Sequence, residues 1–280
     1  MKVHIRKGKS PYKTTEELLD SMKFSLSGKR VFIKANVHPA KIPSTDVNVI
    51  RAVVDRLKNC DIVVGGNVGI MGKSFAVNNY HSLESKGVRL VDLDLDKKVM
   101  MKVKNPRRFR KIPIASSCLD CDYFINVSKM KIHNHAKVTL CLKNLFGCIP
   151  GTAKLLMHPY INDAIHDYMQ VIGSDLNIID GIVGCQNDEF YVNPIRSGIV
   201  IGGCDALSVD VVGSKCMGVD PSEVEYLRLL NYEKTRIETT GERIEDVMRE
   251  YDRRKRPVRI IRNFMEKGIL AAVRLNLISR

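Results

Sequence analysis

The amino-acid sequence predicts an α/β fold, in which an open, mainly parallel sheet is flanked by helices and followed by a basic helical extension at the carboxyl end. Three observations support this fold class. Short apolar, β-rich runs alternate with helical patterns in the first third of the chain, and two more apolar runs follow at 176–180 and 199–201. With 280 residues, 44% of them hydrophobic, the chain can bury a full core. Such alternation favours parallel strands joined by right-handed crossovers.

The first helix and strand are predicted near the amino end. Thr14 and Glu17 have the spacing of a capping box, which predicts a helix from Thr14 to about Ser25. Residues 30–37 are rich in β-branched side chains and predict a strand. Asp46 precedes a segment whose apolar residues recur at helical spacing, so it is expected to cap the second helix.

The next elements complete a βαβαβ order. Residues 61–64 predict a short buried strand, residues 73–86 a helix and residues 88–95 another strand. The turn at 66–74 reads GNVGIMGKS and lies between a strand and a helix, where backbone N–H groups can bind phosphate. Its glycine spacing differs from that of a nucleotide-binding P-loop. A looser anion-binding turn and a plain tight turn both remain open.

One domain is expected over 1–232, and the stretch 97–114 is the best candidate for an insertion within it. The basic helical extension is expected over 233–280. Half of the net charge of +14 lies in residues 249–280, with ten Lys or Arg against three acids. The predicted helix at 259–278 is amphipathic and basic, which suits docking on the main domain, pairing with another subunit or peripheral contact with an acidic membrane.

A run of alternating cations in the middle of the chain is the strongest functional signal. Residues 126–137 read NVSKMKIHNHAK. If this run is extended throughout, Lys129, Lys131, His133, His135 and Lys137 share one face, because successive side chains of a strand alternate. Aligned like charges repel one another unless water or an anion covers them. The run therefore predicts one wall of an anion site, and the alternative is a solvated edge strand whose lysines oppose aggregation.

The following segment adds polar groups that can converge on the same pocket. VTLCLKNLFGCIPGTAKLLMH predicts a short helix carrying Lys143 and Asn144, then a Gly/Pro turn, then a second helix that opens near Lys154. Lys154 and His158 are four residues apart and are expected on one helical face.

The segments quoted from residues 126–158, together with IIDGIVG and CDALSVDVVGSKCMGVDP, resemble the family named domain of unknown function 362. The opening VFIKANV and STDVNVIRAVVDRLK are also similar to that family, so the resemblance covers roughly residues 30–232. Lys34 and Asn36 of VFIKANV join the ligand-binding candidates, and Asp180, Asp205 and Asp210 match acids of the family. Many members resembling this chain carry a segment with two four-iron, four-sulfur clusters, but this chain has no CxxCxxCxxxCP run.

The eight cysteines give a weaker signal. Cys118 and Cys121 form a single CxxC, whereas a metal site usually needs a second pair. The others, apart from Cys60, lie among apolar neighbours, where a free cysteine is commonly a small buried residue. Buried structural thiols are therefore expected, and a gathering of Cys118, Cys121 and Cys148 would indicate a metal or cluster site instead. No metal or cofactor is assigned from the sequence.

Hydrolases, zinc proteases and nicotinamide-dependent enzymes are disfavoured, because the sequence contains no GxSxG, HExxH or GxGxxG motif. A second basic run at 97–111 holds eight cations and no acid, but it lacks the aromatic rows of single-strand binders. Nucleic-acid binding is thus disfavoured. The start MKVHIRKGKS lacks the apolar core of a secretory signal, and no eighteen-residue apolar stretch occurs, so a cytoplasmic location with reduced thiols is expected.

The sequence is therefore interpreted as that of an enzyme acting on a phosphate- or carboxylate-bearing small molecule. Lys131, His133 and Asp180 are the catalytic candidates; the ligand-binding candidates are Lys34, Asn36, Asn126, Lys129, Lys143, Asn144, Lys154, His158 and Asp205. Histidine suits proton transfer because its pKa lies near neutrality, and a desolvated lysine could act as a nucleophile. The alternatives are an accessory protein for an iron–sulfur or ferredoxin-type partner, and a basic module that binds a nucleic acid or a membrane surface. The oligomeric state stays open.

Overall fold

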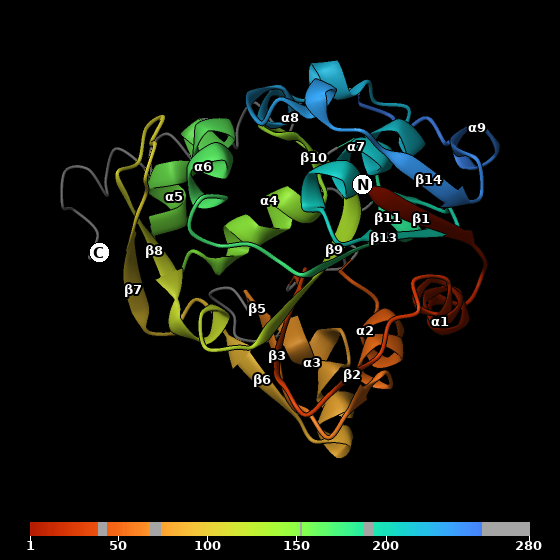
Figure 1. Ribbon diagram of the computed structural model, residues 1–280, viewed down its shortest axis with the longest axis horizontal. Coiled ribbons are helices and arrows are strands. Elements are labelled where there is room, and N and C mark those ends of the chain that lie inside the picture. The colour runs from red at the N-terminus through yellow and green to blue at the C-terminus, as the bar shows by residue number, and fades with distance from the viewer. Residues whose placement is uncertain (39–43, 68–73, 152, 188–192, 254–280) are drawn as a thin grey trace.

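The computed structural model describes residues 1–38, 44–67, 74–151, 153–187 and 193–253. A mixed, mostly parallel central sheet runs through the molecule, with helices on both of its faces (Figure 1). The predicted fold class is thereby confirmed. Along the sheet the strands follow one another in the order β14 (Glu238–Gly241), β1 (Lys2–Lys7), β13 (Ile199–Gly203), β11 (Leu176–Cys185), β9 (Tyr123–His133), β3 (Arg30–Ala35), β5 (Asp61–Gly66) and β6 (Val88–Asp92).

Strand direction decides where functional side chains can meet. The pairs β11–β9, β9–β3, β3–β5 and β5–β6 are all parallel, whereas β13 runs antiparallel to both β11 and β1. Two short strands are added at the sides, with β10 (Lys137–Thr139) antiparallel to β9 and β12 (Pro194–Ile195) antiparallel to β11. The carboxyl ends of the five parallel strands therefore share one edge of the sheet, where open α/β proteins place their sites.

The amino-terminal helices cover one face of the sheet. α2 (Val47–Val54) begins as expected, because the Asp46 carboxylate accepts a hydrogen bond from Asn48 N at 2.8 Å. α1 (Pro11–Ser21) begins earlier than the Thr14 capping box predicted, since Ser10 is its cap and Pro11 its first residue. Instead of one helix over 73–86, the chain forms α3 (Ser74–Val77) and a 3-10 helix, η1 (Tyr80–Lys86).

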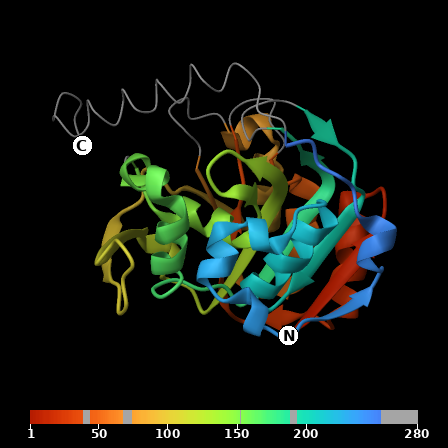
Figure 2. The same ribbon diagram turned by 90° about the horizontal axis from the view of Figure 1, so that it is seen from above.

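The later helices cover the opposite face (Figures 1 and 2). They are α4 (Cys141–Leu145), α5 (Ala153–Met157), α6 (Ile161–Tyr168), α7 (Ala206–Cys216), α8 (Glu225–Leu229) and α9 (Ile244–Val247). Each face has its own hydrophobic core, because strand side chains alternate between the two. Phe32 and Phe124 pack into the α4 side, while Ile33 and Ile125 pack into the α2 side.

Two regions bear on the expected domain plan. The stretch near 97–114 forms a hairpin, β7 (Lys98–Lys102) with β8 (Lys111–Ala115), which is a separate two-stranded sheet. A further two-stranded pair is formed by β2 (Leu26–Ser27) and β4 (Leu57–Lys58). Residues 238–241 were expected in the helical extension, but they form β14, which pairs in parallel with β1. A boundary after 232 therefore removes an edge strand from the main sheet.

The predicted tail helix at 259–278 and residues 68–73 of the glycine-rich turn lie outside the described residues. Among the described helices, none combines the length and the apolar character needed to cross a membrane.

Candidate functional site

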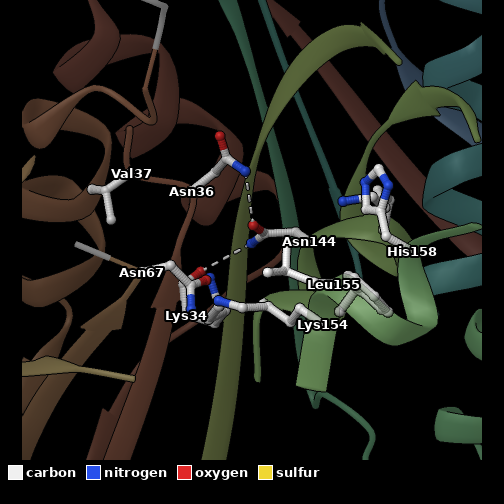
Figure 3. Close-up of a pocket in the computed structure, with 11 residues that line it drawn as sticks. Lys34, Asn36, Val37, Asn67, Asn144, Lys154, Leu155 and His158 are labelled. Carbon is white, nitrogen blue, oxygen red and sulfur yellow. Dashed lines mark hydrogen bonds between the residues drawn. The ribbon is translucent and has the colours of Figure 1, made fainter. Parts of the chain in front are cut away.

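A cavity of about 190 Å³ opens at the carboxyl edge of the parallel strands, between β3 and the segment from α4 to α5 (Figure 3). Its described lining is rich in amines and amides. The lining consists of Lys34, Asn36, Val37, Asn67, Lys143, Asn144, Phe146, Gly147, Lys154, Leu155 and His158. Six predicted ligand-binding residues therefore lie around one cavity: Lys34, Asn36, Lys143, Asn144, Lys154 and His158.

The described lining of the cavity is rich in groups that can carry positive charge. Three of the lining side chains are lysines, and none of the described lining residues is an acid. Two lining residues contact the carboxylate of Asp94, whose Oδ1 accepts hydrogen bonds from Lys154 Nζ and, at 3.1 Å, from Asn67 Nδ2. Lys154 is thus partly neutralised by Asp94. The arrangement suits a small anion, because ammonium and carboxamide N–H groups are the donors that carboxylates and phosphates accept.

Lys34 differs from the other cavity lysines because it is almost fully buried, at 1% exposure. Its Nζ donates a hydrogen bond to Ala35 O at 2.7 Å, and no acid in the described ranges forms a salt bridge with it. Burial lowers the pKa of Lys34, and the opposing attraction of Cys148, Cys118 and Asp94 does not cancel that effect. Gly147 lies against the amine, because a Cβ there would be 2.8 Å from Lys34 Nζ.

A chain of carboxamides links the cavity to the centre of the sheet. Asn36 Nδ2 donates to Asn144 Oδ1 at 3.2 Å, and Asn144 Nδ2 donates to Asn126 Oδ1 at 2.8 Å. Asn126 Nδ2 in turn donates to Asn177 Oδ1 at 3.2 Å and to Cys141 O at 2.9 Å. Asn126 is buried and does not line the cavity. Its hydrogen bond holds the carboxamide of Asn144 in one orientation at the cavity.

The cation ladder predicted over 126–137 is only partly correct. β9 ends at His133, residues 134–136 form a turn, and Lys137 begins the return strand β10. Lys129, Lys131 and His133 do share a face, but each is at most 4% exposed and none lines the cavity. Because side chains alternate along β9, Lys129 lies on the α2 face of the sheet. Asn126 and Ser128 lie on the other face, where they contact α4.

Asp180 is held by structural contacts. Its carboxylate forms an ion pair with Lys129 Nζ at 2.7 Å and accepts hydrogen bonds from Asp46 N at 2.8 Å and Ile182 N at 3.1 Å. All three donors lie on the α2 face, and Asp180 has no exposed surface. The predicted catalytic pairing of Asp180 with the cavity residues is therefore not formed. Instead, the ion pair fixes the start of α2 against β9 and β11.

Asp205 lies at the opposite edge of the sheet. β13 is antiparallel to β11, with Gly203 beside Asn177, so the end of β13 meets the start of β11. There Asp205 caps α7 by accepting a hydrogen bond from Ser208 N at 2.8 Å. Asp205 therefore does not join the cavity, because the antiparallel direction of β13 puts its end at the opposite edge of the sheet.

Asp210 lies one helical turn along α7 and contacts the start of α4. Its carboxylate accepts hydrogen bonds from Cys141 N at 2.7 Å, Leu142 N at 3.0 Å and Tyr226 OH at 3.1 Å. Burial raises the pKa of Asp210 to about 7, although these three hydrogen bonds act in the opposite direction. The carboxyl group anchors the helix that carries Lys143 and Asn144.

His133 is held as a neutral ring beside the cavity. Its Nδ1 accepts hydrogen bonds from His135 N and Ala136 N, both at 3.1 Å, so the ring proton is on Nε2. Burial lowers the pKa of His133 well below the usual value, with the nearby charge of Lys143 and the rings of His158 and His135 adding to the effect. The ring centroids of His133 and His158 are 5.4 Å apart. This geometry does not favour His133 Nδ1 as the proton acceptor, since it already accepts two backbone hydrogen bonds.

The two cysteines of the CxxC motif, Cys118 and Cys121, lie in different environments. Cys118 and Cys148 are both buried, and each thiol affects the pKa of the other. Cys121 is half-buried and its thiol contacts Cys118 O at 3.7 Å. Although burial opposes a thiolate, the hydrogen bond from Cys118 and the charges of Lys34 and Lys154 lower the pKa of Cys148. Within the described residues, no group of three or more His, Cys, Asp or Glu side chains is placed to hold a metal ion.

Three features of the site were missed from the sequence. Asn67 directly follows β5, Asp94 follows β6 by two residues, and Gly147 allows the Lys34 amine to reach the backbone. Asn67 and Asp94 carried a usable signal, because polar residues just after parallel strands lie at the site edge. Gly147 could have been found only from the approach of Lys34, which the sequence does not show.

The fold and the cavity define an open α/β protein with a small basic site at its carboxyl strand edge. The chain belongs to the family described as domain of unknown function (DUF362), whose model matches residues 31–215. It is also similar to a thylakoid-associated protein of Synechocystis sp., with 27% identity over 124 residues. That match covers 41% of this chain and 39% of the relative, so the chain matches only about two fifths of the relative's length.

Two solved structures are similar in fold at low sequence identity. The lactate racemase apoprotein from Thermoanaerobacterium thermosaccharolyticum has a TM-score of 0.49 and 14% identity, covering 79% of this chain and 57% of that one. A Thermotoga maritima protein has a TM-score of 0.45 and 11% identity, covering 68% of this chain and 54% of that one.

Proposed function

We propose that this protein is an enzyme that binds a small phosphate- or carboxylate-bearing molecule in the cavity between β3 and α5. The observation that carries the proposal is the described lining, which combines three lysines, three asparagines and a histidine with no acid. Positive charge held in a partly enclosed site attracts an anion more strongly than the same charge on an open surface, because water screens it less. The cavity volume of about 190 Å³ limits the ligand to a few heavy atoms within it.

The ion pair between Lys154 and Asp94 provides a test of this proposal in which two variants have opposite expected effects. Asp94 competes with a bound anion for Lys154. Asp94→Asn removes that competitor and is expected to strengthen the binding of inorganic phosphate. Lys154→Met removes a cation and leaves the Asp94 carboxylate uncompensated, so binding is expected to weaken by about tenfold or more. Isothermal titration calorimetry with phosphate and with glyoxylate measures both effects.

Lys104→Met is the matched control, because Lys104 is exposed and lies on the loop of the β7–β8 hairpin. This variant should keep the wild-type affinity. Equal affinities for all four proteins, or a loss of affinity in Asp94→Asn, would contradict an anion site at the cavity. A gain in Asp94→Asn is not expected from a purely structural role of the ion pair, since breaking a structural contact would not improve binding.

A second candidate function, peripheral contact with an anionic lipid surface, is favoured by the β7–β8 hairpin. All eight cations of the predicted basic run are exposed: Lys97, Lys98, Lys102, Lys104, Arg107, Arg108, Arg110 and Lys111. Lys102 lies directly opposite Lys111 in the hairpin register, and Met100, at 57% exposure, follows on the same outer face. Apolar side chains among lysines are typical of surfaces that insert shallowly into lipid headgroups. The thylakoid association of the Synechocystis relative accords with this candidate.

A further inference from the structure

We propose that Lys34 is the amine nucleophile of the site and that it forms an imine with a small 2-oxo acid bound in the cavity. This inference rests on the proposed anion site and names the class of its substrate. Lys34 is the most buried of the described lysines that line the cavity, and it differs from Lys154, which is ion-paired with Asp94. Its side chain is 1% exposed, yet it contributes to the cavity wall.

The surroundings of Lys34 disfavour its charged form. An ammonium group has three N–H donors, and the described residues give Lys34 one hydrogen-bond acceptor, Ala35 O at 2.7 Å. No described carboxylate forms a salt bridge with it, in contrast to the buried Lys129, which is paired with Asp180 at 2.7 Å. A buried cation without a carboxylate partner tends to lose its proton. The resulting neutral amine is the nucleophilic form of lysine.

The position of the amine fits a substrate with two functional groups. Figure 3 shows the Lys154 side chain running from α5 toward Lys34 and Asn67, so the ends of the two lysines lie on the same side of the cavity. A carboxylate bound by Lys154 can therefore place an adjacent carbonyl carbon at Lys34. Gly147 permits this position of the amine, since a Cβ there would clash with Lys34 Nζ at 2.8 Å and with Asn67 Oδ1 at 2.5 Å.

The proposed step is a condensation without a redox change. The lone pair of neutral Lys34 Nζ attacks the carbonyl carbon, and the C=O π electrons move to oxygen. Proton transfer gives a carbinolamine, which loses the former carbonyl oxygen as water. The product is a C=N bond between Lys34 and the acid. Burial of the site favours this product, because water that would hydrolyse the imine is largely excluded.

The charged and titratable groups facing Lys34 come from four segments. They are Cys148 of the 3-10 helix η3 (Phe146–Cys148), Cys118 of η2 (Ser116–Cys118), Lys154 of α5 and Asp94 after β6. Burial lowers the pKa of Lys34 despite the opposing attraction of both thiols and Asp94. Each unit by which an amine pKa falls raises its neutral fraction near neutral pH about tenfold. Lys34 is therefore expected to react at lower pH than exposed lysines do.

Reductive trapping tests the proposal with the wild-type protein. Glyoxylate is added with sodium cyanoborohydride, which reduces imines, and the carboxymethyl adduct at each lysine is quantified by peptide mass spectrometry. Lys34 is expected to be labelled about tenfold faster than the exposed Lys102 and Lys104 at neutral pH, and inorganic phosphate should slow only the labelling of Lys34. Native mass spectrometry of wild type and Lys34→Met without the reductant detects the imine itself, which should be lost in the variant.

The outcomes separate this inference from the anion site on which it rests. If calorimetry shows anion binding at the cavity but Lys34 is labelled no faster than Lys104, the nucleophile is rejected and the anion site stands. If neither anion binding nor selective labelling occurs, both proposals fail. If Lys34 is labelled fast but phosphate does not slow it, the assignment of a 2-oxo acid held by the cavity lysines is contradicted.

Discussion

The cavity and the β7–β8 hairpin both concentrate lysine, but they place it in opposite environments. Lys34 is buried between the sheet and η3, and the hairpin cations are all exposed. Water solvates the hairpin charges at little cost, so these side chains keep ordinary lysine chemistry. Burial makes the charge of Lys34 costly, so this side chain gains from an anion or from losing its proton. The same residue type therefore serves different chemistry according to its access to water.

The largest expected effect concerns the buried ion pair between Lys129 and Asp180, which distinguishes Lys129 from Lys34. Lys129→Met leaves the fully buried Asp180 carboxylate without its cation and should reduce the free energy of unfolding by about 3–5 kcal/mol. Lys102→Met on the hairpin should change it by less than about 0.5 kcal/mol. Urea denaturation followed by circular dichroism measures both. Similar small losses in the two variants would show that burial of the cation does not distinguish them.

Two buried aspartates that anchor the two regions are expected to respond to pH with opposite signs. Asp210 anchors α4 at the cavity, and burial raises its pKa to about 7. A raised acid pKa means that the folded state binds the proton more tightly than the unfolded state does. The contribution of Asp210 to stability is therefore present at low pH and declines as the pH rises from about 4 to about 7. Asp210→Asn should remove this decline. The difference in the free energy of unfolding between wild type and variant should therefore shrink as the pH rises across that range.

Asp167 anchors the hairpin by accepting hydrogen bonds from the backbone N–H groups of Arg107, Arg108 and Phe109 at 2.7–2.8 Å. Burial acts against the charged form, but these hydrogen bonds and that of His166 together lower its pKa. Its contribution is present above the ordinary aspartate pKa and is lost as the pH falls below that value. Asp167→Ala should cost about 1–3 kcal/mol near neutral pH and less in acid. A cost that grows in acid would contradict this assignment.

The smallest expected effect concerns the hairpin surface itself. The double variant Lys102→Met/Lys111→Met should weaken co-sedimentation with vesicles containing phosphatidylserine by about 1 kcal/mol for each lysine removed, and the wild-type interaction should weaken with added salt. Vesicles of phosphatidylcholine alone should not bind. Asp94→Asn is the matched control because its charge change lies at the cavity. Binding that does not change with salt concentration or headgroup charge would contradict the lipid candidate. Preferential binding to DNA would favour a nucleic acid instead.

How far the sequence predicts the fold is clearest at β3, β5 and β6. The alternation of β-rich and helical segments gave their parallel order, because both signals depend on local periodicity. The direction of β13 could not be read in this way. It depends on which edge of the sheet the returning chain joins, and that choice moved Asp205 away from the cavity.

How far the sequence predicts the site is clearest at β9. Alternation correctly grouped Lys129, Lys131 and His133, but it did not say which face of the sheet Lys34 and α4 would occupy. Lys129 therefore lies on one face of the sheet, whereas Asn126, Lys34 and α4 lie on the other. Lys34 and Asn36 were identified through the family resemblance, while Asn67 and Asp94 required the parallel pairing of β5 and β6 to bring them beside Lys154.

The most direct test of the central claim is to locate a bound anion in crystals of the protein. Selenate resembles phosphate in shape and charge, and its selenium can be located by anomalous diffraction. An anomalous peak is expected inside the cavity within hydrogen-bonding distance of Lys143 or Lys154, and it should be lost when glyoxylate is added in excess. A cavity without a peak, in crystals where selenate occupies only the hairpin lysines, would contradict the claim that burial rather than charge density creates the anion site.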